Sequence, residues 1–167
     1  YNALPYLKYL ADPNYCHMCY NDLSVRLTDA SLGVIGTDDS TDDRTTSSWK
    51  TILIGGMRFG GACDGGAPPP PGTVSNVGYS AYYAIDITDA EAPVPLWEFS
   101  DPDMGYSTGF PSILRTGNAS KNGNWYVTFG SGSTVMPKNA TDIGRARTSP
   151  DPGYLYILDL ETGERVQ

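Results

Sequence analysis

The stretch WKTILIGGMRFGG, residues 49–61, begins as a buried strand and ends in glycines. Its apolar run KTILI has the length and the β-branched content of a strand packed between neighbouring sheets. The glycines that follow allow the chain to turn sharply where side chains would collide. A second passage of similar form, NWYVTFGSG, occupies residues 124–132. The two passages together indicate a repeated β-structure.

The chain as a whole has the composition of strands joined by turns. Of its 167 residues, 40% are hydrophobic and 11% are aromatic, which is enough for one domain-sized core. Glycine, proline and tyrosine are frequent, and helix-forming residues do not dominate. Strand periodicity predicts seven strands, at residues 24–29, 50–57, 80–88, 95–100, 110–116, 124–132 and 153–160, and the leucine spacing of residues 3–11 predicts one short helix.

An internal repeat organises these strands. Trp125 lies 76 residues after Trp49, and Asp159, at the end of YILD, lies 73 residues after Asp86, at the end of YYAID. Repeats of this length are typical of β-propellers, whose blades are four-stranded sheets and number about 4 to 8. The chain has room for about two blades. We therefore predict an all-β partial β-propeller, with a small β-sandwich of similar strand spacing as the alternative.

The predicted organisation has three parts. Residues 1–22 form the helix and an entry segment, residues 23–104 form a first blade with long loops, and residues 105–167 form a second, incomplete blade. Two blades alone would expose sheet edges and an unpaired blade face. The chain also begins without Met, so we expect a processed product or a piece of a longer polypeptide, held against further blades or partner chains.

The charge pattern excludes several classes of partner. The formal net charge is −8, and the 11 basic residues are scattered along the chain. A scattered basic set does not prepare a surface for phosphates, so nucleic acid is not expected as a partner. No apolar run approaches the ~20 residues of a membrane span, and the first residues lack the pattern of a signal peptide.

Three cysteines leave several interpretations open. Cys16 and Cys19 flank His17 in the order C-H-M-C, and Cys63 follows in a glycine-rich loop. Haem attachment would need a histidine directly after the second cysteine, where Tyr20 stands instead. The three cysteines with His17 could nominally bind zinc, although no second C-x-x-C is present. The alternative is a disulfide between Cys63 and Cys16 or Cys19, if the protein is exported.

The remaining polar motifs favour structure over catalysis. His17 is the only histidine, and a structural histidine near Asp22 is the simpler interpretation. Asp101 and Asp103 in DPDMG could pair as in a glycosidase but are typical of a turn. GSGS at 130–133 lacks the lysine of a phosphate loop. The sequence thus predicts no catalytic, cofactor-binding or metal-binding residues.

Two further motifs concern surface loops. Asn118 and Asn139 begin N-x-S/T sequons, which mark glycans only where the producing cell modifies them. The acidic loop 36–48 places Asp38, Ser40 and Asp42 at alternating positions, without the glycine and the closing glutamate of a complete calcium loop. We expect this loop to be solvated and exposed.

These motifs, taken in order, resemble the C-terminal propeller of the PilY family of type IV pilus biogenesis and tip-associated adhesin proteins. The resemblance rests on NALPYLKYLADPNYCH, WKTILIGGMRFGG, YYAIDIT, PLWEFSDPDMGYSTGFPSIL, NWYVTFGSG and LYILDLETG, and it covers about residues 3–164. The loop 62–78 is longer than the resemblance leads us to expect, and the cysteines that flank His17 depart from the pattern.

The resemblance implies a non-enzymatic protein that supports pilus biogenesis and surface adhesion. It implies an exported protein. The implied location ranges from the periplasm and outer membrane to the extracellular pilus tip or cell surface. The implied partners are minor pilins or other pilus subunits, a surface or host ligand, and the rest of the propeller. The family binds calcium through a loop of the Asp-x-Asp/Asn-x-Asp type, of which this chain has no full copy.

An enzymatic alternative comes from one element. LDLETGE resembles the blade element of pyrroloquinoline quinone dehydrogenases, in which Asp-x-x-Thr-Gly precedes a tryptophan. The chain has no adjacent cysteines and no recognisable cluster for calcium and quinone, so the likeness indicates shared architecture.

Overall fold

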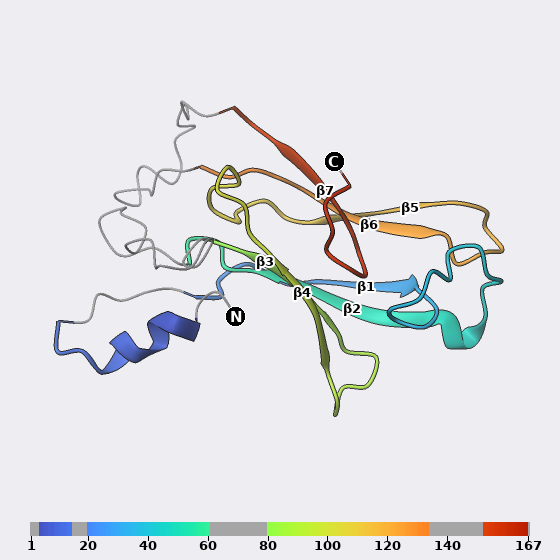
Figure 1. Ribbon diagram of the computed structural model, residues 1–167, viewed down its shortest axis with the longest axis horizontal. Coiled ribbons are helices and arrows are strands. Elements are labelled where there is room, and N and C mark those ends of the chain that lie inside the picture. The colour runs from blue at the N-terminus through green and yellow to red at the C-terminus, as the bar shows by residue number, and fades with distance from the viewer. Residues whose placement is uncertain (1–3, 15–19, 61–79, 134–151, 167) are drawn as a thin grey trace.

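A computed structural model of the chain describes residues 4–14, 20–60, 80–133 and 152–166 as two stacked antiparallel sheets. The four-stranded sheet has the order β1 (Arg26–Ser31), β2 (Trp49–Gly56), β3 (Tyr82–Asp86), β4 (Val94–Phe99), and the three-stranded sheet has the order β5 (Ser112–Thr116), β6 (Asn124–Gly130), β7 (Leu155–Asp159). Each predicted strand is confirmed to within about two residues. The all-β class is confirmed, and the two sheets, which form no closed barrel, are consistent with part of a propeller (Figure 1).

The predicted N-terminal helix is present as a 3-10 helix, η1 (Leu4–Ala11). A 3-10 helix has three residues per turn, so Leu4, Leu7 and Leu10 lie in line along it. All three are exposed, at 56%, 43% and 53%. One further 3-10 turn, η2 (Thr46–Ser48), was not expected from the sequence and leads directly into β2. No helix in the described part of the chain has the length and apolar character to cross a membrane.

The two sheets repeat the same strand register. In the first sheet Ile52 pairs with Asp86, and in the second Tyr126 pairs with Asp159. The hydrogen bonds just beyond these pairs also correspond, because Ile87 N–H donates to Thr51 O at 2.9 Å and Leu160 N–H donates to Trp125 O at 2.9 Å. The predicted repeat is therefore a repeat of structure as well as of sequence.

The tryptophans, however, are not equivalent positions. The register matches Trp125 to Thr51, two residues beyond Trp49 along β2. The aspartates at the strand ends are equivalent, and each accepts hydrogen bonds in a local turn. Asp86 Oδ1 accepts from Thr88 N–H at 2.8 Å, and Asp159 Oδ1 accepts from Thr162 N–H at 2.9 Å. Short carboxylates close such turns well, which is why they recur at this place.

The hydrophobic core lies between the sheets. It contains Ile52, Ile54, Tyr82 and Ala84 from the first sheet and Val127, Phe129, Tyr156 and Leu158 from the second, all buried. The rings of Tyr82 and Phe129 stack across the interface with centroids 3.9 Å apart. Tyr82 also donates its hydroxyl hydrogen to Gly109 O at 2.7 Å, which satisfies the buried phenol.

The packing is head to tail. By register, the core residues of the first sheet correspond to Tyr126, Thr128, Leu155 and Ile157, on the outward face of the second sheet. The core residues of the second sheet correspond to Leu53, Gly55, Tyr83 and Ile85, on the outward face of the first sheet. Unlike faces of equivalent sheets therefore meet, and both outward faces carry apolar side chains.

Trp97 on β4 contacts the turn that follows β7. Its indole N–H donates to Leu160 O at 2.9 Å. Gly163 adopts a positive φ of 71°, and a Cβ placed on it would lie 2.4 Å from Trp97 Cγ. Only glycine fits this contact without displacing the ring. The LDLETG element thus anchors the second sheet on the outermost strand of the first.

Residues 164–166 run along the free edge of β7. Asp159 N–H donates to Glu164 O at 2.9 Å, and Val166 N–H donates to Ile157 O at 2.8 Å. Arg165 pairs with Leu158 in an antiparallel bridge. This short pairing occupies the place that β4 takes beside β3 in the first sheet.

Candidate functional site: the loop end of the two sheets

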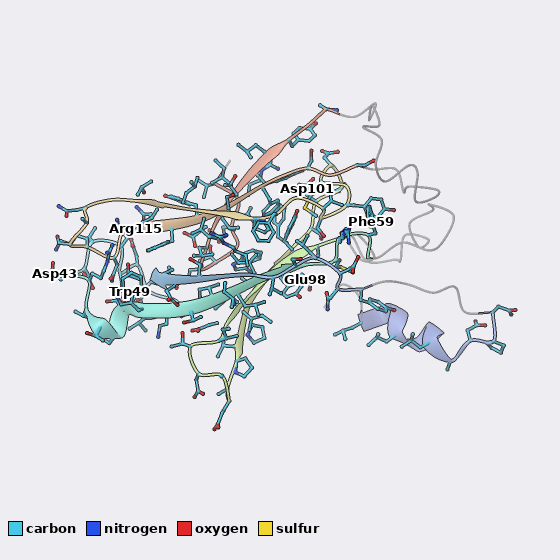
Figure 2. The ribbon with its side chains drawn as sticks, turned by 180° about the vertical axis from the view of Figure 1, so that it is seen from behind. Asp43, Trp49, Phe59, Glu98, Asp101 and Arg115 are labelled. Atoms are coloured by element: carbon cyan, nitrogen blue, oxygen red, sulfur yellow. The ribbon has the colours of Figure 1, made fainter. Side chains whose placement is uncertain are left out.

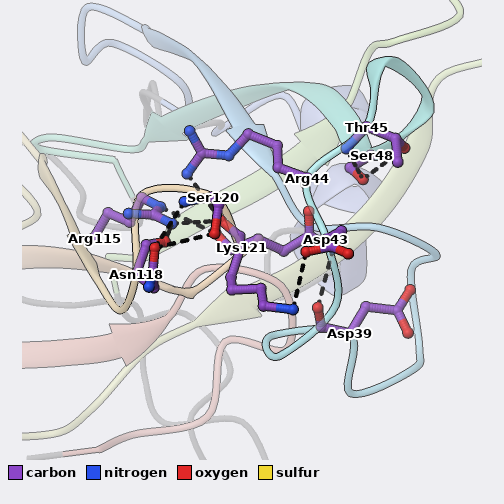
Figure 3. A network of polar contacts seen from close by, with 10 residues as sticks. Asp39, Asp43, Arg44, Thr45, Ser48, Arg115, Asn118, Ser120 and Lys121 are labelled. Carbon is purple, nitrogen blue, oxygen red and sulfur yellow. Dashed lines mark hydrogen bonds and ion pairs between the residues drawn. The ribbon is translucent and has the colours of Figure 1, made fainter.

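Two polar loops meet at one end of the stacked sheets. One is loop 33–48, between β1 and β2, and the other is turn 117–123, between β5 and β6. Figure 2 shows Asp43, Trp49 and Arg115 together at this end, and Figure 3 shows the contacts in detail. We call these two segments together the loop end.

Backbone hydrogen bonds join the two loops. Arg44 N–H donates to Ser120 O at 2.9 Å, and Asn122 N–H donates to Asp42 O at 3.0 Å. Gly123 N–H donates to Ser40 O at 2.8 Å. The prediction that loop 36–48 is simply solvated is therefore only partly right: Asp42 and Asp43 are exposed, whereas Ser48 is buried.

Two arginines hold the turn of the second sheet. Arg115 donates to the carbonyl oxygens of Asn118 at 2.7 Å, Lys121 at 2.6 Å and Asn122 at 3.0 Å. Arg44 donates from Nη2 to Lys121 O at 3.0 Å. Desolvation and then the nearby charge of Arg44 lower the pKa of Arg115. The Lys121 ammonium forms an exposed ion pair with Asp43 at 2.9 Å (Figure 3).

Asn122 is the centre of the loop end. Its side chain is 2% exposed, and its backbone oxygen accepts from Ser31 Oγ at 3.0 Å and from Trp125 Nε1 at 3.1 Å. Its Nδ2 donates to Asp39 O at 3.0 Å. Its Oδ1 is buried and has no hydrogen-bond partner in the described structure. An orphaned acceptor of this kind is uncommon in a folded protein.

Two cavities open beside Asn122 and the acidic loop. One has a volume of about 580 Å³ and is lined by Gly33, Val34, Ile35, Asp39, Asp42, Asp43, Thr45, Ser47, Ser48, Lys50, Asp86, Val94 and Asn122. The other, of about 420 Å³, is lined by Leu32, Gly36, Thr37, Asp38, Asp39, Ser40, Gly123, Asn124, Trp125, Asp159, Glu161 and Thr162. We call them the Asn122 cavity and the Glu161 cavity.

The alternating residues of the acidic loop do not converge on one cavity. Asp38 and Ser40 line the Glu161 cavity, whereas Asp42 lines the Asn122 cavity. Asp38 Oδ1 instead accepts from Ser40 Oγ at 2.7 Å in a local turn. Within the described residues, no group of three His, Cys, Asp or Glu side chains could hold a metal ion. Asp38, Ser40 and Asp42 therefore do not surround one common cavity.

Acidic neighbours perturb the carboxylates around the Glu161 cavity. Burial, and then the charges of Asp159, Asp39 and Asp38, raise the pKa of Glu161, although a hydrogen bond from Gly36 N–H opposes them. Hydrogen bonds from Val34 N–H and from Thr37 lower the pKa of Asp39. The cavity is lined by acidic residues and contains no lysine or arginine in its lining.

The other sequence candidates have structural roles where they are described. Asp101 Oδ1 accepts from Asp103 N–H at 2.8 Å, as in a turn, and its Oδ2 lies 3.5 Å from Arg165 Nη1. Asn118 lies exposed in turn 117–123, where its Oδ1 accepts from Ser120 N–H at 3.0 Å. Ser131 of the GSGS segment accepts from Tyr154 N–H at 2.9 Å.

Several candidates lie outside the described residues. These are Cys16, Cys19, Cys63, His17 and Asn139. The cysteine pairings, the zinc alternative and the second sequon therefore stay predictions. Sequence reasoning in turn missed Arg115, Lys121 and Asn122, because nothing in RTGNASKNGN marks these residues as partners of loop 33–48.

An apolar groove lies on the outward face of the first sheet. Its volume is about 680 Å³, and it is lined by Leu4, Leu7, Tyr20, Asn21, Met57, Tyr83, Ala84, Ile85, Pro95, Leu96, Trp97 and Glu98. The groove thus joins η1 to strands β3 and β4. Its apolar lining agrees with the apolar character of the outward face.

The chain is similar in sequence to proteins named as type IV pilus biogenesis factors. The chain is 30% identical, over 99% of its length, to a protein of Xylella fastidiosa strain Temecula1 named "Type IV pilus biogenesis factor PilY1 homolog". It is 29% identical, over 88% of its length, to the "Type IV pilus biogenesis factor PilY1" proteins of two Pseudomonas aeruginosa strains, PAO1 and PAK.

These matches cover only 8% and 9% of the relatives' own lengths, so the chain corresponds to less than a tenth of each curated relative. No family model matches the chain, and no solved structure matches it. The similarity nevertheless extends along nearly the whole chain, including both sheets and the loop end. The chain is therefore a PilY-family region.

Proposed function

We propose that this chain is a non-enzymatic structural region of a type IV pilus-associated protein that supports pilus biogenesis and surface adhesion. The observation that carries the proposal is the 30% identity, along 99% of the chain, to a protein named as a type IV pilus biogenesis factor homolog. The proposed location is the cell envelope and the outer surface, up to the pilus tip. Its partners would be minor pilins or other pilus subunits, together with a surface or host ligand.

The head-to-tail packing supports a propeller scaffold. In a sandwich of two sheets, the paired inner faces close the structure and the outward faces meet solvent. Here the outward face of each sheet corresponds to a face that is already packed in the other, so each can receive a further sheet in the same manner. We therefore propose that further blades continue this stack in the longer protein.

The roles of the acidic residues support a non-catalytic function. Asp86, Asp101 and Asp159 all accept hydrogen bonds from backbone N–H groups of the turns that follow them. A glycosidase would instead need two carboxyl groups that face each other across a substrate cleft. Binding surfaces in such scaffolds are carried by loops, so we assign the contacts with partners to the loops at the ends of the sheets.

Deletion and complementation test the pilus function. Loss of the gene should reduce surface pili, counted by electron microscopy, and attachment to a surface. The full-length gene should restore both, and the same gene with an in-frame deletion of this region should not. A full-length gene that carries Gly153→Ala, at a glycine with no atom within 4 Å of an added Cβ, is the matched control. Unchanged piliation and attachment in the deletion strain would refute the proposal.

The quinoprotein alternative has one structural observation in its favour. Trp97 packs on Gly163 of the LDLETG element, although this tryptophan comes from β4 and does not follow the Asp-x-x-Thr-Gly motif in the sequence. An enzyme of that class would bind pyrroloquinoline quinone and reduce an artificial electron acceptor. The purified full-length protein, supplied with the quinone and calcium, should show neither quinone absorbance after gel filtration nor dye reduction. Turnover of the dye would favour the enzyme over the scaffold.

A further inference from the structure

Asn122 and Gly123 form the one Asn-Gly pair in the sequence. An asparagine side chain forms a succinimide when the next backbone nitrogen attacks its amide carbon, and glycine, which has no Cβ, shields that nitrogen least. The other asparagines all precede residues that carry a side chain, as Asn118 does before Ala119. By sequence alone, Asn122 is therefore the asparagine with the greatest tendency to react in this way.

In the folded protein, the nitrogen that would attack is engaged. Gly123 N–H donates to Ser40 O at 2.8 Å, so the proton that must leave before the attack is held in a hydrogen bond between the two loops. Gly123 and Asn122 are both buried. Burial keeps the water and the base that the reaction needs away from this nitrogen.

The side-chain amide of Asn122 is protected as well. Its Nδ2, the group that would leave, donates to Asp39 O at 3.0 Å. Its Oδ1 is buried and has no donor within the described part of the chain. Attack on the amide carbon would place a negative charge on Oδ1, and a buried oxyanion without a donor is strongly disfavoured. The orphaned oxygen therefore opposes the reaction.

The backbone of Asn122 is also fixed. Its N–H donates to Asp42 O at 3.0 Å. Its oxygen accepts from Ser31 Oγ at 3.0 Å, Arg115 Nε at 3.0 Å and Trp125 Nε1 at 3.1 Å. Attack requires the Gly123 nitrogen to approach the side-chain carbon in the correct orientation. The backbone cannot rotate to reach that geometry unless these hydrogen bonds break.

We propose that Asn122 is a latent modification site, at which opening of the loop end leads to irreversible conversion of the asparagine to aspartate or isoaspartate. Gly123 N loses its proton to a base and bonds to Asn122 Cγ, the Cγ–Nδ2 bond breaks, and the side-chain nitrogen leaves as ammonia. Water then adds to either carbonyl group of the succinimide and opens the ring. Water is the only co-reactant, and the opening that frees the Gly123 nitrogen also admits it.

The product cannot restore the closed loop end. Both products carry a carboxylate in place of the Nδ2 group, so the hydrogen bond to Asp39 O is lost and a negative charge is added beside Asp42. Isoaspartate also lengthens the backbone by one methylene group, which displaces Gly123 N–H from Ser40 O. Conversion therefore holds the loop end open and changes a surface that the proposed function assigns to contacts with partners.

Peptide mapping by mass spectrometry tests the site. The purified chain is incubated at mildly alkaline pH, folded or in urea, and electron-transfer fragmentation distinguishes aspartate from isoaspartate at position 122. In urea, Asn122 should be converted faster than any other asparagine of the chain, because every protecting hydrogen bond is gone. In the folded chain its conversion should be much slower, since it is limited by the small population of molecules with an open loop end.

Two variants of the same turn relate the reaction to opening. Arg115 reaches across the turn to the carbonyl oxygens of Asn118 and Lys121 (Figure 3). Arg115→Ala should therefore raise the rate of conversion in the folded chain by about 10- to 100-fold. Lys121→Ala removes an exposed ion pair and should change this rate by less than about 5-fold. Hydrogen exchange of the Gly123 amide should rise by the same factor as the conversion in each variant.

Three results would overturn the proposal. The first is conversion of Asn122 that is no faster in urea than in the folded chain. The second is the same rate of conversion in Arg115→Ala as in the unchanged chain, although exchange of the Gly123 amide is faster. The third is full protection of that amide in Asn122→Asp, which carries one of the products from the start. None of these results bears on piliation, so this proposal can fail while the pilus function stands.

Discussion

The indole rings of Trp49 and Trp125 meet edge to face across the two sheets, with centroids 6.5 Å apart and planes at 68°. A guanidinium lies over each ring, Arg44 at 5.2 Å from the centroid of Trp49 and Arg115 at 5.8 Å from that of Trp125. The two residues that mark the repeat in the sequence are therefore in contact, although they occupy different register positions. The contact joins the start of β2 to β6 at the loop end.

The contact between the two indole rings predicts a measurable coupling free energy between Trp49 and Trp125. Edge-to-face aromatic pairs contribute about 0.5–1.5 kcal/mol beyond the area they bury. A double-mutant cycle of Trp49→Leu and Trp125→Leu, read from urea unfolding, should give a coupling in that range. The same cycle between Trp49→Leu and Trp97→Leu should be additive within about 0.5 kcal/mol, because Trp97 packs on the turn after β7 instead. Additivity in both cycles would contradict the role assigned to the ring contact.

A methyl group at Gly163 should destabilise the protein strongly. The added Cβ would meet Trp97 Cγ at 2.4 Å, and the backbone φ of 71° disfavours any side chain. We expect Gly163→Ala to lower the free energy of unfolding by about 2–4 kcal/mol. Gly153→Ala, where nothing lies within 4 Å, should change it by less than about 0.5 kcal/mol. Similar unfolding midpoints for the two variants would show that Trp97 can move aside at little cost.

Arg115 and Lys121 should differ in their contribution to stability. Arg115 donates to three backbone oxygens of its turn, and charged hydrogen bonds of this kind contribute roughly 1.5–3 kcal/mol. The ion pair of Lys121 with Asp43 joins side chains that are 40% and 79% exposed, so solvent screens it. Arg115→Ala should therefore cost about 2–3 kcal/mol, and Lys121→Ala less than about 1 kcal/mol. Equal losses of unfolding free energy for the two variants in chemical denaturation would contradict this ranking.

Stability should fall at high pH through Tyr156. Burial, and then the Asp101 carboxylate, raises the pKa of this phenol from 10.0 to about 12. The unfolded chain then loses the phenolic proton first, so stabilisation is complete below pH about 10 and is lost as the pH rises towards about 12. Burial also raises the pKa of Tyr82, Tyr83 and Tyr106, which act in the same direction.

Urea midpoints measured across this pH window test the assignment. Tyr156→Phe should lower stability slightly at neutral pH, because it removes the 3.3 Å hydrogen bond to Asp101. It should also make the decline above pH about 10 shallower, because one of the groups that titrates is gone. A decline with the same slope in the variant would mean that Tyr156 does not contribute.

The strands were predictable because their signals are local. Alternating apolar residues, the glycines after β2 and the aspartates at the ends of β3 and β7 each act within a few residues of their own position. The repeat also predicted that the sheets are equivalent. The sequence repeat, however, aligned Trp49 with Trp125, because both are tryptophans at the start of a strand. The hydrogen-bond register, which the sequence does not reveal, makes Thr51 the equivalent of Trp125.

The loop end was not predictable because its contacts are distant in sequence. Asn122 is 83 positions from Asp39 and 91 from Ser31, and no periodicity brings such residues together. The acidic pattern of loop 33–48 predicted an exposed, solvated loop and did not indicate that its backbone pairs with turn 117–123. Which carboxylates face which cavity depends on how the second sheet stacks, and that is a property of the packed core.

The packing of unlike sheet faces against each other also affects how such a protein could gain or lose sheets during evolution. In the proposed propeller, every unit would offer one surface that receives and one that is received, so the gain or loss of a unit would leave all other junctions chemically unchanged. The number of units would then depend on the small rotation from one unit to the next, because this rotation determines how many units close a ring. Duplication of a single segment would therefore extend such a protein without any need for new surfaces to evolve.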